Sequence, residues 1–153
     1  MPSEGKHLDG ATLREIGRLC AAQPDVVLAY VFGSRVAGQP GSDSDLDVGV
    51  VCRRGADRMK ALARLEIALL DSLPFKADAV DLLDTSILFQ HSVIRQGRNV
   101  FASSDEARVG YETRIHTLAD DERYDQEVRT RLLLEKIEQG AFGGRTRTPR
   151  QPS

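Results

Sequence analysis

The sequence predicts a small α/β (α+β) fold, in which a mixed sheet is flanked by helices that lie on one side of it. Short β-branched runs alternate with longer stretches whose apolar residues recur every three or four positions. Two of the strand-like runs flank a loop rich in Gly, Pro and Ser, which favours a hairpin-like pair. At 153 residues the chain is long enough for one domain with a real core, which we expect over residues 9–138.

The first elements are bounded by clear start and stop signals. A helix is predicted from Asp9 or Thr12, either of which could cap it, and it stops at Pro24. The run DVVLAYVF, residues 25–32, is short and β-branched and predicts a buried strand. The run DLDVGVVC, residues 45–52, alternates and then turns wholly apolar, as a central strand does.

The second half of the chain continues the alternation of helices and strands. An apolar stripe predicts a long helix that ends before Pro74, and the next strand is expected to join the same sheet. The remaining expected elements are a strand over 76–83, a helix over 85–95, an extended piece over 98–101, a helix capped within 103–106 and a last helix over 120–139. The segment 139–153 has almost nothing to bury and predicts a disordered, basic tail.

Composition excludes several classes of protein. The chain has 21 Lys and Arg against 23 Asp and Glu, so no overall field attracts nucleic acid or an anionic membrane. Cys20 and Cys52 lack CxxC spacing and are expected to be reduced core thiols rather than zinc ligands. No signal pattern precedes the domain, and the longest apolar run is too short to span a bilayer. We therefore expect a soluble, cytoplasmic protein.

Two acids stand where the second strand enters the core. Asp45 and Asp47 are one residue apart, so in a strand both carboxylates point to the same face. Close like charges repel unless a cation lies between them, and an all-oxygen site suits Mg²⁺ or Mn²⁺. The alternative is that Asp45 belongs to a polar loop and Asp47 to a solvated strand position.

A Gly-Ser pair precedes these acids. Gly33 follows a strand, so its backbone can adopt a positive φ or approach a ligand closely, and the Ser34 hydroxyl and amide can contact phosphate oxygens. The alternative is an ordinary turn, and no Gly-Lys-Ser/Thr follows to make a Walker loop. A phosphate contact beside paired carboxylates provides the groups needed for in-line attack on a nucleotide phosphate.

The stretch GSRVAGQPGSDSDLD, in which Gly-Ser is followed after ten residues by Asp-x-Asp, resembles the signature of polymerase-β-like nucleotidyltransferases. Its compactness is similar to that of minimal nucleotidyltransferase (MNT) domains. The later segments ADAVDLL, VIRQGRNVF and DEARVGYETR resemble MNT-type antitoxins in order and spacing, and the likeness covers roughly residues 13–133. It implies a polymerase-β-like fold and a HEPN ribonuclease toxin as partner, silenced by transfer of AMP from ATP to a toxin tyrosine.

The resemblance assigns roles to particular residues. Gly33 and Ser34 would contact the ATP phosphates, and Asp45 and Asp47 would be catalytic ligands of two Mg²⁺ ions. Arg35 could meet a phosphate or be an ordinary surface residue. Members of the family often have a second Arg two positions later, where this chain has Ala37, and that departure bears on triphosphate affinity.

A third carboxylate should come from the neighbouring strand. Asp78 and Asp81 are both candidates, and because they are three apart in a strand only one can share the face of the first two acids. Spacing against the family favours Asp78, which would hold the second metal and help to take the proton from the attacking hydroxyl. Asp81 would then be solvated or cap the next helix.

Two other functions compete with transfer to a partner protein. One is transfer of a nucleotide to a small molecule such as an aminoglycoside, which would need a second domain or a dimer to build the acceptor pocket. The other is an antitoxin that neutralises its partner by binding alone. None of the three requires a membrane or direct contact with nucleic acid.

Overall fold

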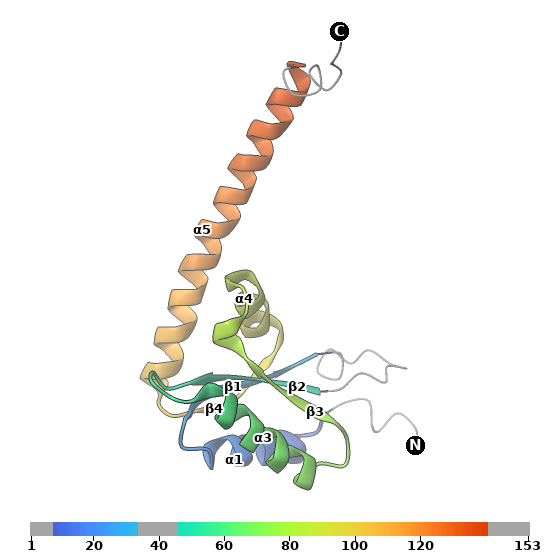
Figure 1. The fold of residues 1–153 in the computed structure, drawn as a ribbon, viewed down its shortest axis with the longest axis vertical. Helices are drawn as coiled ribbons and strands as arrows, with labels where there is room; N and C mark the ends of the chain where they lie inside the picture. The colour runs from blue at the N-terminus through green and yellow to red at the C-terminus, as the bar shows by residue number, and fades with distance from the viewer. Residues whose placement is uncertain (1–7, 34–45, 141–153) are drawn as a thin grey trace. The chain divides into compact units, whose positions relative to one another are not determined.

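The computed structural model describes residues 8–33 and 46–140. Its elements follow the predicted order almost throughout (Figure 1). They are α1 (Gly10–Ala21), β1 (Val26–Phe32), β2 (Leu46–Cys52), α3 (Arg58–Ser72), β3 (Ala77–Asp81), the short 3₁₀ helix η2 (Leu82–Asp84), α4 (Ile87–Gln96), β4 (Arg98–Ala102) and α5 (Asp105–Glu138).

The four strands form one mixed sheet in the order β3-β2-β1-β4. β1 pairs antiparallel with β2 and with β4, so the hairpin-like pair around the Gly-Ser loop is confirmed. β3 joins the sheet beside β2 and runs parallel to it, after a crossover through α3. A mixed α/β fold is thus confirmed, with β3 and β4 as the two edges.

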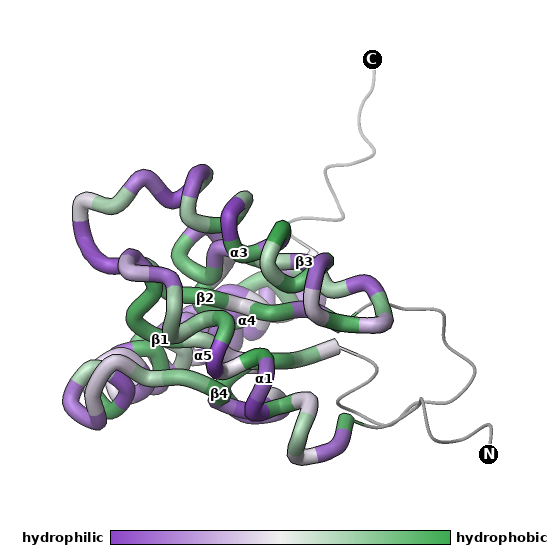
Figure 2. Tube along the Cα trace, turned by 90° about the horizontal axis from the view of Figure 1, so that it is seen from below, coloured by the Kyte–Doolittle hydropathy of each residue, from purple (hydrophilic) through white to green (hydrophobic). Residues whose placement is uncertain are grey.

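The first face of the sheet carries an aliphatic core under α1 and α3. Alternate residues of β2, Leu46, Val48 and Val50, are fully buried there. They pack against Ile16 of α1 and Leu65 of α3. Figure 2 shows the hydrophobic colour running along β1 and β2 in the middle of the fold.

The opposite face is covered by α4 and by the first part of α5, so the expectation that the helices lie on one side was wrong. Leu28 and Tyr30 of β1 pack there against Val93 of α4 and Ile115 of α5. The reason is visible in β1 itself, because a strand that is apolar at consecutive positions must be covered on both faces.

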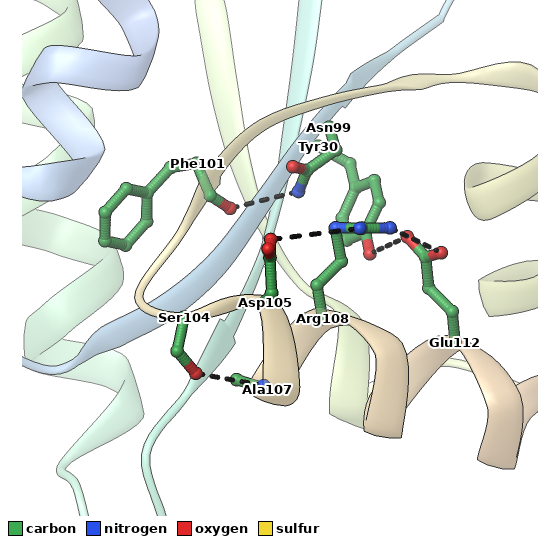
Figure 3. Close-up of polar contacts among 8 residues, drawn as sticks. All are labelled: Tyr30, Asn99, Phe101, Ser104, Asp105, Ala107, Arg108 and Glu112. Carbon is green, nitrogen blue, oxygen red and sulfur yellow. Dashed lines mark hydrogen bonds and ion pairs between the residues drawn. The ribbon is translucent and has the colours of Figure 1, made fainter.

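Side chains cap the first turns of three helices, the first of them at Asp9, one of the two caps expected there. Asp9 caps α1 by accepting the Thr12 amide at 2.8 Å. Ser86 caps α4 through the Phe89 amide at 3.1 Å. Ser104 accepts the Ala107 amide at 3.0 Å at the start of α5 (Figure 3). Each hydroxyl or carboxylate satisfies one of the amides that a first turn leaves without an intrahelical partner.

The two helices expected between residues 103 and 139 are instead one continuous helix, α5. No Pro lies in it, and its one Gly, Gly110, has open space around it, so no residue forces a break. An ion pair of 3.6 Å between Asp120 and Arg123 spans one turn where the break was expected.

The chain divides into two compact units, Met1–His116 and Thr117–Ser153. In the described part of the second unit, helical residues expose large apolar side chains, among them Tyr124, Leu132, Leu133, Leu134 and Ile137. Of the predicted tail, residues 141–153 lie outside the described part of the chain. No helix in residues 8–33 and 46–140 is both long and apolar enough to span a membrane.

Both cysteines behave as predicted for core thiols. Cys20 and Cys52 are free and buried. Burial raises the pKa of the Cys20 thiol from 9.0 to about 12, because a thiolate would lose its hydration there.

Candidate active site

The candidate site is built on neighbouring positions of two parallel strands. Asp47 of β2 is the direct register partner of Asp78 of β3. Adjacent strands lie about 4.8 Å apart, and register partners point to the same face of a sheet. The fold therefore places two carboxylates side by side, although the residues are 31 positions apart in the sequence.

The face to which these acids belong follows from the residues around them. Leu46 and Val48, on either side of Asp47, are fully buried in the core under α1 and α3. Asp47 therefore lies on the opposite face, where its antiparallel partner is Phe32. Asp47 and Asp78 are both partly exposed.

Gly33 lies at the same end of the sheet. It follows the last residue of β1 and has a φ of 108°, in the region that side-chain-bearing residues rarely adopt. The predicted positive φ is thus confirmed. Since β1 ends where β2 and β3 begin, the Gly33 turn, Asp47 and Asp78 gather at one end of the sheet.

Asp81 occupies a different environment. Its position in β3 has the parity of Ala77 and Ala79, which pack against the aliphatic core, so it lies on the face opposite Asp47. Its carboxylate pairs with Arg58 of α3 at 2.8 Å and accepts the Leu83 amide at 3.2 Å. Asp81 therefore anchors α3 and caps η2, as expected for the acid that is not in the site, and the geometry favours Asp78.

Three of the predicted site residues, Ser34, Arg35 and Asp45, lie outside the described residues, as does Ala37. The site as described contains Gly33, Asp47 and Asp78.

Glu66 is a neighbour of the site that the sequence did not suggest. From α3, its Oε2 accepts the amide of Ala79 at 2.9 Å, one residue beyond Asp78. This bond satisfies an amide on the open edge of β3 and ties that strand to the helix above it. A charged residue in a helix gives no sign in the sequence that it will cover a distant strand edge.

A pocket of about 380 Å³ lies beside the site, between α3 and β3. Ala63, Glu66, Ile67 and Leu70 form its helical wall, and residues 76–78 form the other. A second pocket of about 320 Å³ lies farther along β3 and includes Met59, Val80 and Asp81. Only the first of these two pockets shares a residue with the candidate site.

The donor set suits a hard divalent cation. Asp47 and Asp78 offer carboxylate oxygens from adjacent strands, the ligands that Mg²⁺ and Mn²⁺ prefer. Among residues 8–33 and 46–140, no group of three or more His, Cys, Asp or Glu side chains could hold a metal. The described carboxylates are therefore a pair, to which Asp45 would add a third.

Comparison with known proteins identifies the family. A family model described as "Polymerase beta, Nucleotidyltransferase" matches residues 14–106, which is more than half of the chain. The protein adenylyltransferase MntA of Shewanella oneidensis is 32% identical over 85 residues, which cover 54% of this chain and 59% of that protein. The chain thus matches less than two thirds of that relative's length.

Solved structures share the fold. A toxin–antitoxin crystal structure with AMP-PNP has a TM-score of 0.62 at 21% identity and covers 80% of this chain and 98% of that one. A structure of tri-AMPylated Shewanella oneidensis HEPN toxin with its MNT antitoxin has a TM-score of 0.58 at 19% identity, covering 80% and 95%. The polymerase-β-like fold implied by the sequence is confirmed, and this chain belongs to the polymerase beta nucleotidyltransferase family.

Proposed function

We propose that this protein is an antitoxin adenylyltransferase, which transfers AMP from ATP to a tyrosine of a partner HEPN-type ribonuclease toxin and thereby silences it. The observation that carries the proposal is the adjacent pair Asp47 and Asp78 beside the Gly33 turn, in a chain of the nucleotidyltransferase family. The likeness to MntA supports the reaction. Structures that hold AMP-PNP or an AMPylated HEPN toxin support the donor and the partner.

The residues at the site fit the chemistry of this transfer. Asp45, Asp47 and Asp78 would hold two Mg²⁺ ions, which when bound neutralise the charge of the triphosphate and of the developing transition state. Gly33 leaves room for phosphate oxygens, with Ser34 and Arg35 as further contacts. Asp78 would also help to accept the proton of the attacking hydroxyl.

The bonds made and broken define what the protein must position. The tyrosine oxygen forms a bond to the α-phosphorus, the bond from that phosphorus to the bridging oxygen breaks, and pyrophosphate leaves. The phenolic proton passes to the carboxylate and then to water. The protein's contribution is to align these atoms.

The test is the intact mass of the purified HEPN-type partner after incubation with this protein, Mg²⁺ and each nucleoside triphosphate in turn. We expect a gain of one or more AMP groups with ATP, none with EDTA, and none with Asp47→Asn, which removes one carboxylate without disturbing the buried face of β2. A partner that gains no mass but still loses ribonuclease activity would indicate neutralisation by binding alone. Transfer to an aminoglycoside but not to the partner would indicate a small-molecule acceptor.

A further inference from the structure

An aromatic pair lies beside the candidate site. Phe32 is the antiparallel register partner of Asp47, so the two side chains lie on the same face of the sheet. The ring of Phe32 meets the ring of Phe89, from the first turn of α4, edge to face with 5.6 Å between the ring centroids. Across β1, β2 and β3 this face therefore carries a row of register partners, Phe32, Asp47 and Asp78, with a second ring at the β1 end.

Gly49 allows the ring of Phe32 to reach the strand that carries Asp47. Gly49 is two residues after Asp47 in β2 and so has the same face of the sheet. A Cβ on Gly49 would lie 3.0 Å from Cε1 of Phe32 and 2.8 Å from Cδ2 of Leu82, so both side chains lie directly over the glycine backbone. The ring of Phe32 therefore extends across to β2 and lies within two residues of Asp47.

The second ring is on the flank of α4 that faces away from α5. His91 is on the α5 side, where its ring approaches His116 to 2.7 Å, and it lies about 200° around the helix from Phe89. Phe89 instead contacts Phe32, whose ring lies over β2, and it is 39% exposed. An exposed aromatic ring beside a polar site offers a surface on which a planar group can stack.

The position of the pair favours the nucleotide, rather than the acceptor, as the molecule that stacks there. Gly33, the proposed phosphate contact, directly follows Phe32 in the chain. Asp78, which we assign to the attacking hydroxyl, lies on β3, with β2 in between. The acceptor must arrive at the β3 end of the row, which leaves the β1 end for the donor. Gly33 and the acids would hold phosphates and metal ions, and none of them offers an apolar surface to the base.

We propose that Phe89 stacks on the adenine base of ATP, and that Phe32 is a positioning residue that holds the Phe89 ring. The inference rests on the proposed function and assigns to two residues of this chain the binding of the nucleoside part of the donor. Every nucleobase has a π-face, so this contact raises the affinity for a nucleotide over that for a polyphosphate without a base.

The chain contains no Trp, so one introduced Trp can report the contact. In Phe89→Trp, the Mg²⁺ complex of α,β-methylene-ATP, which cannot be cleaved between its α- and β-phosphates, should quench the indole fluorescence because the base stacks on the indole. Inorganic tripolyphosphate, which has no base, should leave that fluorescence unchanged. Met59→Trp is the matched control, because Met59 is 85% exposed and lines the pocket that includes Asp81; neither ligand should quench it.

Affinity, measured by isothermal titration calorimetry with Mg²⁺, gives the second readout. Phe89→Ala should bind α,β-methylene-ATP on the order of 10-fold more weakly than the wild type and should bind tripolyphosphate equally well. Phe89→Leu keeps an apolar side chain without a ring and should lose nearly as much affinity as Phe89→Ala. Met59→Ala should match the wild type with both ligands.

The outcomes separate this inference from the proposed function. The base contact is overturned, even if AMP transfer is found, by any of three results: the analogue binds to Phe89→Trp without quenching, tripolyphosphate quenches equally, or Phe89→Ala binds the analogue as the wild type does. Quenching by the analogue alone, in a protein that modifies no partner, would support the base contact and overturn the proposed transfer. A wild-type protein that does not bind the analogue would overturn both.

Discussion

The two faces of the sheet differ in the kind of side-chain contacts that they make. The face under α1 and α3 is filled by aliphatic side chains such as Ile16, Val48 and Leu65, all fully buried. In the described part of the chain, the buried polar residues, Gln90 and His91, belong to the helix on the other face. One face therefore supplies stability through packing, and the other combines packing with directed polar contacts.

Those polar contacts on the second face are well formed. The Tyr111 hydroxyl donates to Gln90 Oε1 at 2.8 Å, and the His91 and His116 rings approach to 2.7 Å between Nε2 and Nδ1. The Tyr30 hydroxyl donates to Glu112 at 2.6 Å, and Arg108 contacts the same carboxylate at 3.4 Å (Figure 3). Asp47 and Asp78 lie on this same face. The proposed site is therefore on the face of the sheet that also carries these buried and half-buried polar contacts.

The largest expected effect separates the two acids of β3, which lie on different faces. Asp78→Asn should lower the proposed AMP transfer by on the order of 10²-fold or more, because the proposed site would lose a metal ligand and a proton acceptor together. Asp81→Asn should keep transfer within about twofold of wild type and cost about 1 kcal/mol of stability, since the side chain of its partner Arg58 is 45% exposed and the ion pair is screened by solvent. Single-turnover rates measure the loss of transfer, and urea unfolding measures the loss of stability. Similar losses of transfer in both variants would contradict the assignment of Asp78, rather than Asp81, to the site.

The next effect tests the aliphatic face. Leu65→Ala removes a fully buried side chain and should lower the free energy of unfolding by about 2–5 kcal/mol. Ile67→Ala, two residues along the same helix but 60% exposed, is the control and should change it by about 0.5 kcal/mol or less. Urea denaturation followed by circular dichroism compares them, and equal shifts in midpoint would show that α3 does not bury the face described above.

The smallest effect concerns the polar face. Tyr30→Phe keeps the ring but leaves Glu112 without its 2.6 Å hydrogen bond, which should cost about 1–3 kcal/mol. Burial, followed by the bond to Glu112 and the charge of that residue, raises the pKa of Tyr30 above its ordinary value of 10.0. A raised phenol pKa means that this stabilisation is complete below pH 10 and declines as the pH rises further.

Thermal unfolding between pH 8 and 11 tests this pH dependence. Wild-type stability should fall on the alkaline side, and Tyr30→Phe should fall less steeply because it has lost the group that titrates. Tyr124→Phe, at a residue that is 66% exposed, should follow the wild-type curve. Parallel curves for all three proteins would contradict the role given to the Tyr30 hydroxyl.

Local signals in the sequence predicted most of the elements. Asp9 and Pro24 bound the first helix, and β-branched runs gave β1 and β2 within a residue or two of their observed limits. The run that became β1 was predicted only to be a buried strand, and we expected helices on one side of the sheet; its cover on both faces was not predicted. The break expected within α5 had no Gly or Pro to support it, and helical propensity prevailed.

For the third carboxylate of the candidate site, the sequence left two alternatives open, Asp78 and Asp81. Strand parity separates Asp78 from Asp81, but which of them joins Asp47 depends on the register between β2 and β3, which the length and packing of α3 determine. The contact of Glu66 with the Ala79 amide also depends on how α3 packs against β3. Long-range register and edge protection arise from tertiary packing and leave no local pattern in the chain.

The position of β3 at the edge of the sheet makes the proposed activity sensitive to local opening. Asp78 is carried by a strand of five residues that has a neighbouring strand on one side and the Glu66 carboxylate on the other. Fraying of that strand would separate the two acids while the aliphatic core stays folded. The proposed transfer activity would then be lost before the protein melts, so that its rate would report the first step of unfolding.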